Sequence, residues 1–352
     1  MKLKKHGGNV FKFASDQGIP LESVIDYSAN INPLGLSDKV KDALMDLDDV
    51  LNYPDPDYNR LIQSISDYEK VKSDHIVLGN GGIECLFLVA EALKLKNILI
   101  PVPTFIEYER AFSKYGSVNF FYQDSPFELD LTKVKKALDE SEGIVLCNPN
   151  NPTGYLIKSQ MLYDFLTYAK LHKKRVILDE AFIDFVDDEA EATMVKYLDE
   201  FENLVILKSL TKFFAMPGLR LGYLMTSDVE LIENIKYNKM PWSINCMANR
   251  AGIAALSDLD YIEETKVWIV SERKWFLHEL DNLGLKTYNT QGNYIFFEAK
   301  IGLDDLLKKK GVMIRNCSNY EGLTQGYYRI AIKDRFHNEQ LIRDLKEILW
   351  TS

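Results

Sequence analysis

Residues 209–222 read SLTKFFAMPGLRLG, a stretch that places Lys212 among hydroxyl, aromatic and apolar side chains. An exposed lysine at the edge of an apolar segment would be the ordinary explanation of such a position. Here, however, Ser209 and Thr211 flank the lysine, and Arg220 follows eight positions later, beyond a Pro-Gly turn. Hydroxyl groups and a guanidinium are the donors that a phosphate monoester needs, and arginine presents them as a rigid fork. The stretch therefore predicts a lysine beside a small phosphate site.

Length and composition indicate a globular protein of two domains. The chain has 352 residues, and a single hydrophobic core rarely grows beyond roughly 250–300 residues. It is 46% hydrophobic and 27% charged, with a formal net charge of −10. This charge argues against nucleic acid or an anionic membrane as the main partner, because both require a concentrated basic surface. Any bound anion is expected to be small and held locally.

Several features bear on location and metal content. The N-terminus carries positive charge but lacks the apolar core of a secretory signal, and no run reaches the ~18 apolar residues of a membrane span. The four cysteines and five histidines are dispersed, and the cysteines form no CxxC pair. We therefore expect free thiols in a reducing cytoplasm and no protein-bound metal.

Short apolar runs alternate with helical patterns in the first two thirds of the chain. The runs are rich in β-branched residues and apolar on both faces, which is typical of a mostly parallel sheet covered by helices. The pattern predicts the α/β class. The runs are HIVLGNGG (75–82), NILIPVPT (97–104), GIVLCNPNNPTG (143–154), RVILDEAF (175–182) and NLVILKSLTK (203–212), and helical periodicity marks 83–94 and 159–172.

The pattern changes after about residue 245. A long helical pattern covers roughly 246–283, and two strand-like segments, NYIFFEA and YYRIAIKD, follow it. These features are typical of an α+β unit. We expect a large domain at 32–245 and a small domain built from both termini, 1–31 and 246–352.

The polar residues of interest fall at the ends of the predicted strands. GNGG (79–82), Asn151, Asp179 and Lys212 each follow a strand, and ligands of open α/β sheets bind beyond the carboxyl ends of the strands. Glycines before a helix let an anion approach the helix N-terminus, although the GxxxxGK[ST] spacing of a P-loop is absent. Alone, Asp179 would be explained as a turn cap and Asn151 as a turn residue. Together, an imine-forming lysine, an acid for a ring nitrogen, an amide for a phenolic oxygen and a phosphate cup indicate a pyridoxal phosphate site.

Three motifs carry a family resemblance over nearly the whole chain. NPNNPTG (148–154), DEAFIDF (179–185) and SLTKFFAMPGLRLGY (209–223), in that order and spacing, resemble the fold-type I pyridoxal-phosphate enzymes of the aspartate aminotransferase superfamily. The resemblance implies a large domain with a mostly parallel central sheet, covered by helices, and a smaller α+β domain.

A narrower resemblance is to the threonine-phosphate decarboxylases of cobalamin biosynthesis. Histidinol-phosphate aminotransferases share the core motifs but usually lack the HGGN opening. The matching segments are HGGN (6–9), DYSANINPLG (26–35), YPDPDY (53–58), KMPWSIN (239–245) and IRNCSNYEGL (314–323).

These resemblances imply roles for single residues. Lys212 would carry the cofactor as an imine, Asp179 would pair with the pyridine nitrogen, and Asn151 would contact the ring oxygen. Phe105 would stack on the ring, and Tyr53 would reach the phosphate from the other subunit of a homodimer with shared active sites. The implied phosphate-binding positions are Gly81, Gly82, Ser209, Thr211 and Arg220, and the implied substrate-binding positions are His6, Gly7, Asn30, Asn151, Arg315 and Arg329.

One position departs from the wider superfamily. Aminotransferases commonly have a tyrosine three residues after the ring-nitrogen aspartate, whereas this sequence has Phe182, as in the decarboxylase-like proteins. Loss of that hydroxyl is expected to change the electronics of the cofactor. A surface or interdomain ion pair is the alternative explanation of Arg315 and Arg329.

The implied reaction is decarboxylation of an amino-acid O-phosphate for the nucleotide-loop linker of cobalamin. L-Threonine O-3-phosphate would give (R)-1-aminopropan-2-yl phosphate and CO2, or L-serine O-phosphate would give ethanolamine phosphate. The two substrates differ by one methyl group, worth only about 1–3 kcal/mol in a pocket, so the preference stays open. An aminotransferase that acts on histidinol phosphate or an aromatic amino acid with 2-oxoglutarate is the alternative. A cofactor-binding regulator is disfavoured, because the chain has no helix-turn-helix or basic extension.

Overall fold

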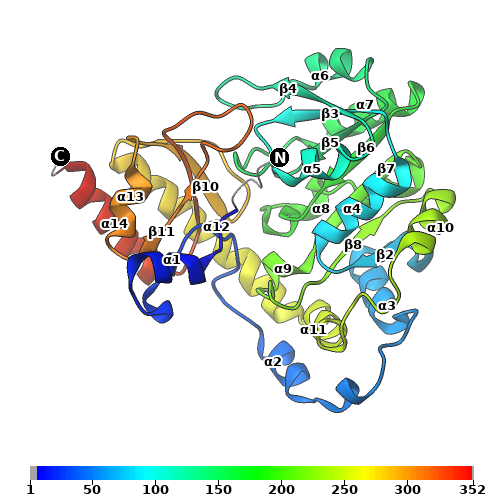
Figure 1. The fold of residues 1–352 in the computed structure, drawn as a ribbon, viewed down its shortest axis with the longest axis horizontal. Helices are drawn as coiled ribbons and strands as arrows, with labels where there is room; N and C mark the ends of the chain where they lie inside the picture. The colour runs from blue at the N-terminus through cyan, green and yellow to red at the C-terminus, as the bar shows by residue number, and fades with distance from the viewer. Residues whose placement is uncertain (1–5, 351–352) are drawn as a thin grey trace.

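The computed structural model describes residues 6–350, which form a larger and a smaller lobe (Figure 1). The larger lobe contains a seven-stranded sheet of order β2-β8-β7-β6-β5-β3-β4. Every neighbouring pair is parallel except the two pairs that involve β8, which confirms the predicted mostly parallel sheet. The strands are β2 (Ile76–Gly79), β3 (Asn97–Val102), β4 (Ser117–Tyr122), β5 (Gly143–Cys147), β6 (Arg175–Asp179), β7 (Leu204–Ser209) and β8 (Gly222–Met225).

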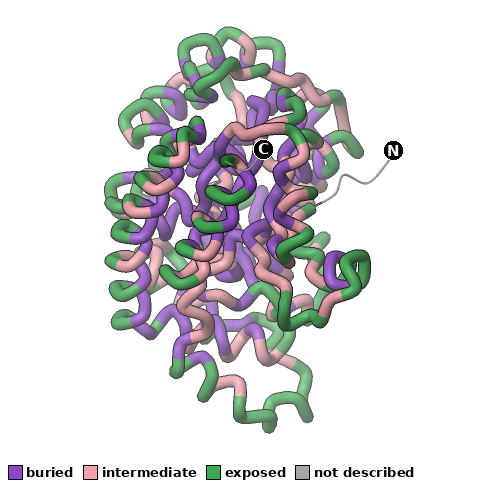
Figure 2. Tube along the Cα trace, turned by 90° about the vertical axis from the view of Figure 1, so that its left-hand side faces the viewer, coloured by how far each residue is buried: buried purple, intermediate pink, exposed green. Residues whose placement is uncertain are grey.

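Helices cover both faces of this sheet. Successive side chains of a strand point to opposite faces, so strands that are apolar throughout need a cover on each face. In β7, Leu204 and Ile206 enter one hydrophobic core, while Val205 and Leu207 enter the other. Buried residues accordingly gather in the centre of the molecule (Figure 2). One core includes α4 (Gly82–Leu93), α5 (Glu107–Phe112) and α10 (Val229–Asn238), and the other includes α3 (Asn59–Glu69), α6 (Leu131–Leu138), α7 (Ser159–Leu171) and α11 (Cys246–Leu256).

The smaller lobe combines the two ends of the described chain. Its four-stranded antiparallel sheet has the order β12-β13-β10-β9, and β1 pairs in parallel with β11. The strands are β1 (Ile25–Asp26), β9 (Lys286–Thr287), β10 (Tyr294–Glu298), β11 (Val312–Met313), β12 (Arg315–Asn316) and β13 (Tyr327–Ala331), and the helices around them include α1 (Val10–Gln17), α13 (Leu303–Lys308) and α14 (Arg335–Trp350).

The remaining elements complete the described chain. The remaining helices are α2 (Asp38–Met45), α8 (Glu189–Ala192), α9 (Leu210–Phe213) and α12 (Leu259–Asn282), and the 3₁₀ turns are η1 (Leu21–Ser23), η2 (Asp48–Leu51), η3 (Ser73–His75), η4 (Ile183–Phe185) and η5 (Val195–Glu200). The 24 residues of α12 make a rod about 36 Å long.

The long helical pattern at 246–283 is two helices rather than one. It breaks between α11 and α12 at Asp258, whose φ of −92° and ψ of 73° are not helical. At the break, Lys39 Nζ of α2 donates to the carbonyl oxygen of Ser257 at 3.2 Å and lies 3.6 Å from Asp258 Oδ1. Asp258 is the residue before α12, so the second helix starts directly after the break.

The predicted domain boundaries at residues 31/32 and 245/246 stay a prediction. Residues 1–5 and 351–352, which belong to the predicted small domain, lie outside the described residues. Within residues 6–350, no helix has the length and apolar character needed to cross a bilayer.

Candidate active site

A cavity of about 430 Å³ opens where the strands β5, β6 and β7 end, and most of the predicted site residues line it. Two of them do not line it. Gly81 lies against the guanidinium of Arg220, and Tyr53 is 82% exposed on the outer surface. The predicted residues that line the cavity are His6, Gly7, Asn30, Gly82, Phe105, Asn151, Asp179, Ser209, Thr211, Lys212, Arg220, Arg315 and Arg329.

Lys212 reaches the cavity from α9, one helical turn that starts directly after β7. Ser209 caps this turn, since its Oγ accepts a hydrogen bond from the Thr211 backbone N–H at 3.4 Å. Burial, together with the positive charges of Arg329 and Arg220, lowers the pKa of Lys212 from 10.5 to about 8, against the opposing charge of Asp179. A lysine with this pKa has a substantial neutral fraction near pH 8, and a neutral amine is the nucleophile that attacks a carbonyl carbon.

Asp179 is the last residue of β6 and is held from two sides. Its Oδ1 accepts from the Ala181 backbone N–H at 2.9 Å, and its Oδ2 accepts from the Tyr108 hydroxyl at 2.6 Å. Burial raises the pKa of Asp179, while the two hydrogen bonds and Lys212 act in the opposite direction. A carboxylate fixed in this way at the wall of the cavity is suited to pair with a cationic ring nitrogen.

The amide of Asn151 has a defined orientation. Its Oδ1 accepts from Arg329 Nη1 at 2.5 Å and from the Tyr320 hydroxyl at 3.4 Å. Because arginine has donors only, the oxygen of the amide must face it. The Nδ2 group of Asn151 is therefore the end that can donate to a phenolic oxygen in the cavity.

A cup of hydroxyl, glycine and guanidinium groups lies at the N-terminus of α4. Ser209 Oγ and Thr211 Oγ1 are 2.7 Å apart, and Gly81 is the residue before the helix, with a φ of 80°. A Cβ atom at Gly81 would lie 2.4 Å from Nη2 of Arg220. Only a glycine at this position leaves room for the guanidinium. Helix N-terminal N–H groups and an adjacent guanidinium are favourable partners for a phosphate.

These residues fit pyridoxal phosphate. A lysine amine, a carboxylate, an amide donor and a phosphate cup all face one cavity. Asn30 is 2% exposed, and neither atom of its amide has a hydrogen-bond partner within residues 6–350. Such atoms are costly unless a ligand satisfies them.

Arg315 and Arg329 face each other across two strands. They are directly opposed in the β12–β13 register, and they are 7% and 5% exposed. Arg315 donates to the Asn316 carbonyl oxygen at 2.6 Å and to Asn319 Oδ1 at 2.7 Å, while Arg329 also donates to the Ser28 carbonyl oxygen at 2.6 Å. Two opposed cations destabilise a sheet by repulsion. Anions bound in the cavity would remove that repulsion.

Two aromatic residues named in the sequence analysis, Phe105 and Phe182, line the cavity. Phe105 lines the cavity, with its ring centroid 6.1 Å from that of His6 and 5.5 Å from that of Tyr108. Phe182 also lines it and packs edge-on against Tyr294 at 5.0 Å. The position three residues after Asp179 therefore has an apolar contact in place of a hydroxyl donor.

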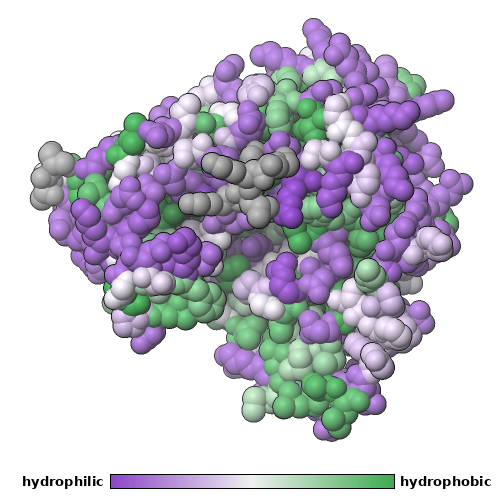
Figure 3. Space-filling model, in the orientation of Figure 1, coloured by the Kyte–Doolittle hydropathy of each residue, from purple (hydrophilic) through white to green (hydrophobic). Residues whose placement is uncertain are grey.

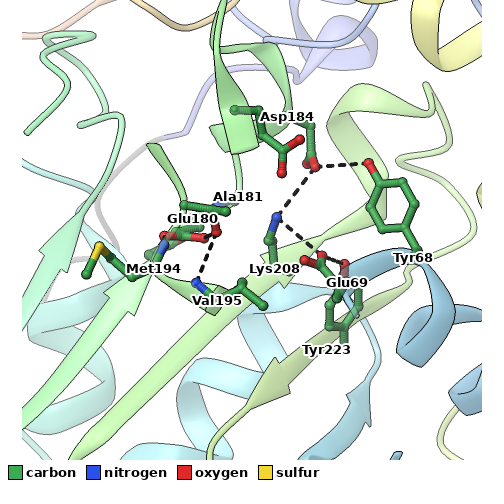
Figure 4. A network of polar contacts seen from close by, with 12 residues as sticks. Tyr68, Glu69, Glu180, Ala181, Asp184, Met194, Val195, Lys208 and Tyr223 are labelled. Atoms are coloured by element: carbon green, nitrogen blue, oxygen red, sulfur yellow. Dashed lines mark hydrogen bonds and ion pairs between the residues drawn. The ribbon is translucent and has the colours of Figure 1, made fainter. Parts of the chain in front are cut away.

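A buried ion network surrounds Lys208, the residue before Ser209 in β7, and the sequence analysis missed it. Lys208 is 1% exposed; its Nζ lies 3.2 Å from Glu69 Oε1 and 3.5 Å from Asp184 Oδ1 (Figure 4). The Tyr223 hydroxyl donates to Glu69, and the Tyr68 hydroxyl donates to Asp184 at 3.3 Å. Burial raises the pKa values of Glu69 and Asp184, whereas these carboxylates raise that of Lys208. The only sequence signal was a lysine within a run that is otherwise apolar on both faces.

Comparison with known proteins places the chain among enzymes of one family. A family model described as aminotransferase class I and II matches residues 22–345. Threonine-phosphate decarboxylase of Salmonella typhimurium is 38% identical over 98% of this chain and 96% of its own length. The adenosylcobalamin biosynthesis bifunctional protein CobDQ of Leptospira interrogans is 29% identical over 99% of this chain and 42% of its own length. The crystal structure of the histidinol-phosphate aminotransferase from Clostridium acetobutylicum has a TM-score of 0.88 and 38% identity, covering 93% of this chain and 99% of that one.

Proposed function

The chain belongs to the class I and II aminotransferase family, and we propose that within this family it is a carboxy-lyase acting on an amino-acid O-phosphate. Its cofactor is pyridoxal phosphate. The proposed substrate is L-threonine O-3-phosphate, with L-serine O-phosphate as the smaller alternative, and the proposed products are the aminoalkyl phosphate and CO2. The relative that acts in adenosylcobalamin biosynthesis supports a place in that pathway.

The opposed pair Arg315 and Arg329 is the observation that carries this proposal. Both guanidinium groups are buried, line the cavity that contains Lys212, and face each other across β12 and β13. An amino-acid O-phosphate brings a carboxylate and a phosphate, which together match two buried cations. An aliphatic amino acid brings only the carboxylate. The arrangement therefore favours a substrate with two anionic groups.

Each reacting residue has a task that its surroundings explain. When bound, pyridoxal phosphate supplies the conjugated system that accepts the electron pair of the bond broken at the substrate α-carbon. With the cofactor bound, Asp179 would keep a proton on its ring nitrogen, and Asn151 Nδ2 would donate to its ring oxygen. Lys212, with a pKa of about 8, can hold a proton near neutral pH and deliver it to the carbon that has lost CO2. The C–CO2 bond breaks, a C–H bond replaces it, and the phosphate is unchanged.

A homodimer with shared sites is part of the proposal. The Tyr53 side chain is 82% exposed, and its ring centroid lies 4.9 Å from that of Trp242. Apolar side chains gather at the lower end of the molecule, in the region of α2 (Figure 1 and Figure 3). At the end of α2 and just after it, Met45, Leu47, Val50 and Leu51 are each more than half exposed. Burying such a surface against a second copy would stabilise the pair. Tyr53 would then reach the phosphate cup of the other subunit.

A cytoplasmic location is also proposed. All four cysteines are free, and Cys85, Cys147 and Cys317 are buried. Unpaired thiols are the usual state in a reducing compartment.

Separate assays of three products test the function. The holoenzyme is incubated with O-phospho-L-threonine, with O-phospho-L-serine, and with histidinol phosphate plus 2-oxoglutarate, and CO2, amine and oxo product are measured separately. We expect CO2 and aminoalkyl phosphate in equal amounts from a phosphorylated amino acid, and none from a Lys212→Ala variant. Transamination of histidinol phosphate without CO2 release from either phosphoamino acid would replace this proposal with the aminotransferase.

A further inference from the structure

An acidic side chain lies in a cavity that otherwise suits anions. Glu107, the first residue of α5, is 6% exposed and lines the same cavity as Arg315 and Arg329. A carboxylate at this place would repel a substrate that carries a phosphate and a carboxylate. Its presence therefore calls for a task that outweighs the repulsion.

The two carboxylate oxygens of Glu107 contact two different side chains, those of His6 and Arg110. Its Oε1 lies 2.7 Å from His6 Nε2, and its Oε2 accepts from Arg110 Nη1 at 3.1 Å. His6 and Arg110 line the cavity as well. The three side chains together are neutral or positive, depending on whether the imidazole is protonated. Arg110 thus offsets the charge of Glu107, so Glu107 can hold His6 at the edge of the cavity without adding a net negative charge.

The backbone that leads from His6 into α1 is fixed by other contacts. The Gly8 N–H donates to Ser28 Oγ at 2.7 Å, and Asn9 caps α1 by accepting from the Lys12 N–H at 3.0 Å. Gly7 lies so close to Ser28 that a Cβ atom there would be 2.6 Å from the Ser28 carbonyl oxygen. These contacts fix where the His6 backbone lies, but they do not set the direction of its ring.

The ring of His6 takes its direction from Glu107. The side chain is 48% exposed, and a half-exposed ring without a strong partner would populate several rotamers. With Nε2 facing Glu107, Nδ1 is the nitrogen that can meet a ligand. In the imidazolium form both nitrogens donate, Nε2 to Glu107 and Nδ1 to an anion.

We propose that Glu107 is a positioning residue that orients the His6 ring at the edge of the cavity, where His6, when protonated, donates from Nδ1 to an anionic group of the substrate. The inference rests on the proposed function for the identity of that substrate. Arg315 and Arg329 supply the two fixed cations from the small sheet, and His6 adds a third donor from the N-terminal segment. Glu107 acts through His6 and touches no reacting atom.

The test compares Glu107→Gln, His6→Gln and the double variant with wild-type holoenzyme. Binding of O-phospho-L-threonine, O-phospho-L-serine and histidinol phosphate is measured by calorimetry, and KM and kcat are measured by CO2 release. Each single variant should weaken binding and raise KM about tenfold, the size expected for losing one charge-assisted hydrogen bond. Affinity for pyridoxal phosphate should stay the same. The exposed Glu140→Gln variant is the matched control and should bind like the wild type.

The double variant separates positioning from independent effects. If Glu107 acts through His6, Glu107→Gln/His6→Gln should bind no more weakly than His6→Gln alone, since contacting residues in one pathway are not additive. Wild-type affinity in Glu107→Gln, or a double variant whose loss is the product of the single losses, would overturn the inference. Absence of CO2 release by the wild type would reject the proposed function but not this inference. Calorimetry would still compare the affinities of the variants for any ligand that binds. If none of the three ligands binds the wild type, His6 has no anion to meet and the inference is wrong.

Discussion

The Tyr108 hydroxyl donates a 2.6 Å hydrogen bond to Oδ2 of Asp179. Tyr108 is fully buried on α5, and burial together with the charge of Asp179 raises the pKa of this phenol well above its usual value. The hydroxyl therefore stays protonated and remains a donor over the whole working pH range. It orients the carboxylate and stabilises its charged form.

Tyr108→Phe is expected to weaken the hold on the cofactor. Removing a hydrogen bond from the charged form of a carboxyl raises its pKa, so the acid limb of the pH–kcat profile should move to higher pH. The loss of one bond to a charged group predicts about a tenfold weaker affinity for pyridoxal phosphate. Equilibrium dialysis and pH-dependent CO2 release measure the two effects. Tyr115→Phe, at a partly buried tyrosine, is the control; equal behaviour of the two variants would contradict a role for Tyr108.

The pH dependence of cofactor attachment should report the pKa of Lys212. Only the neutral amine reacts, and a pKa of about 8 leaves roughly a tenth of it neutral at pH 7. The rate of covalent attachment to the apoprotein should therefore rise through pH 8 and level off above it. Arg329→Met removes a positive charge that lowers this pKa, so the plateau should move to higher pH. Stopped-flow absorbance, with borohydride trapping and peptide mapping to Lys212, checks both; a rate that still rises at pH 10 in the wild type would contradict the lowered pKa.

Much of the fold and the grouping of the site residues could be predicted from the sequence. Asn151, Asp179 and Lys212 follow separate strands, and parallel strands bring their carboxyl ends to one edge of a sheet. That geometry follows from local patterns alone. The edge strand β4 and the antiparallel strand β8 were missed, because β4 is only partly buried and β8 has four residues.

Contacts between distant residues could not be predicted in the same way. Tyr108 meets Asp179 across 71 positions, and Glu107 meets His6 across 101. Neither pair leaves a periodic signal, since each depends on how α5 packs over the sheet.

Lys208→Met should destabilise the protein strongly. The substitution leaves Glu69 and Asp184 buried without their cationic partner, and breaking a buried pair costs about 3–5 kcal/mol. Lys72→Met is the matched control, because Lys72 and its partner Asp199 are each 63% exposed and surface pairs contribute less than about 1 kcal/mol. Urea unfolding of the two apoproteins gives the free energies of unfolding. A similar loss in both variants would show that the buried network contributes little.

Mixed dimers should reveal the proposed sharing of sites. An inactive Lys212→Ala chain and a weak Tyr53→Phe chain, when combined, form a heterodimer in which one site carries both changes and the other carries neither. At equal mixing the population should recover about a quarter of the wild-type activity. Subunit exchange is first verified by mass spectrometry of differently tagged chains. Activity no higher than that of the parents, after verified exchange, would contradict the reach of Tyr53 into the other site.

The two arginines should differ in what they affect. Arg329 donates to Asn151 Oδ1 and so orients the amide that faces the cofactor, whereas the hydrogen bonds of Arg315 join it to Asn316 and Asn319. Arg329→Lys is therefore expected to lower affinity for pyridoxal phosphate and to impair turnover, because lysine lacks the fork that serves Asn151 and the Ser28 carbonyl oxygen together.

Arg315→Lys should leave cofactor affinity unchanged while it raises KM and lowers kcat for O-phospho-L-threonine. Both constants change because energy from binding an anion also positions the bond that breaks. A loss of about tenfold in kcat/KM is expected for each variant, the size of one charge-assisted hydrogen bond. Dialysis against pyridoxal phosphate and steady-state CO2 release separate the two cases. If Arg329→Lys kept full cofactor affinity, the contact between Arg329 and Asn151 would not set the orientation of the amide, and both arginines would serve the substrate alone.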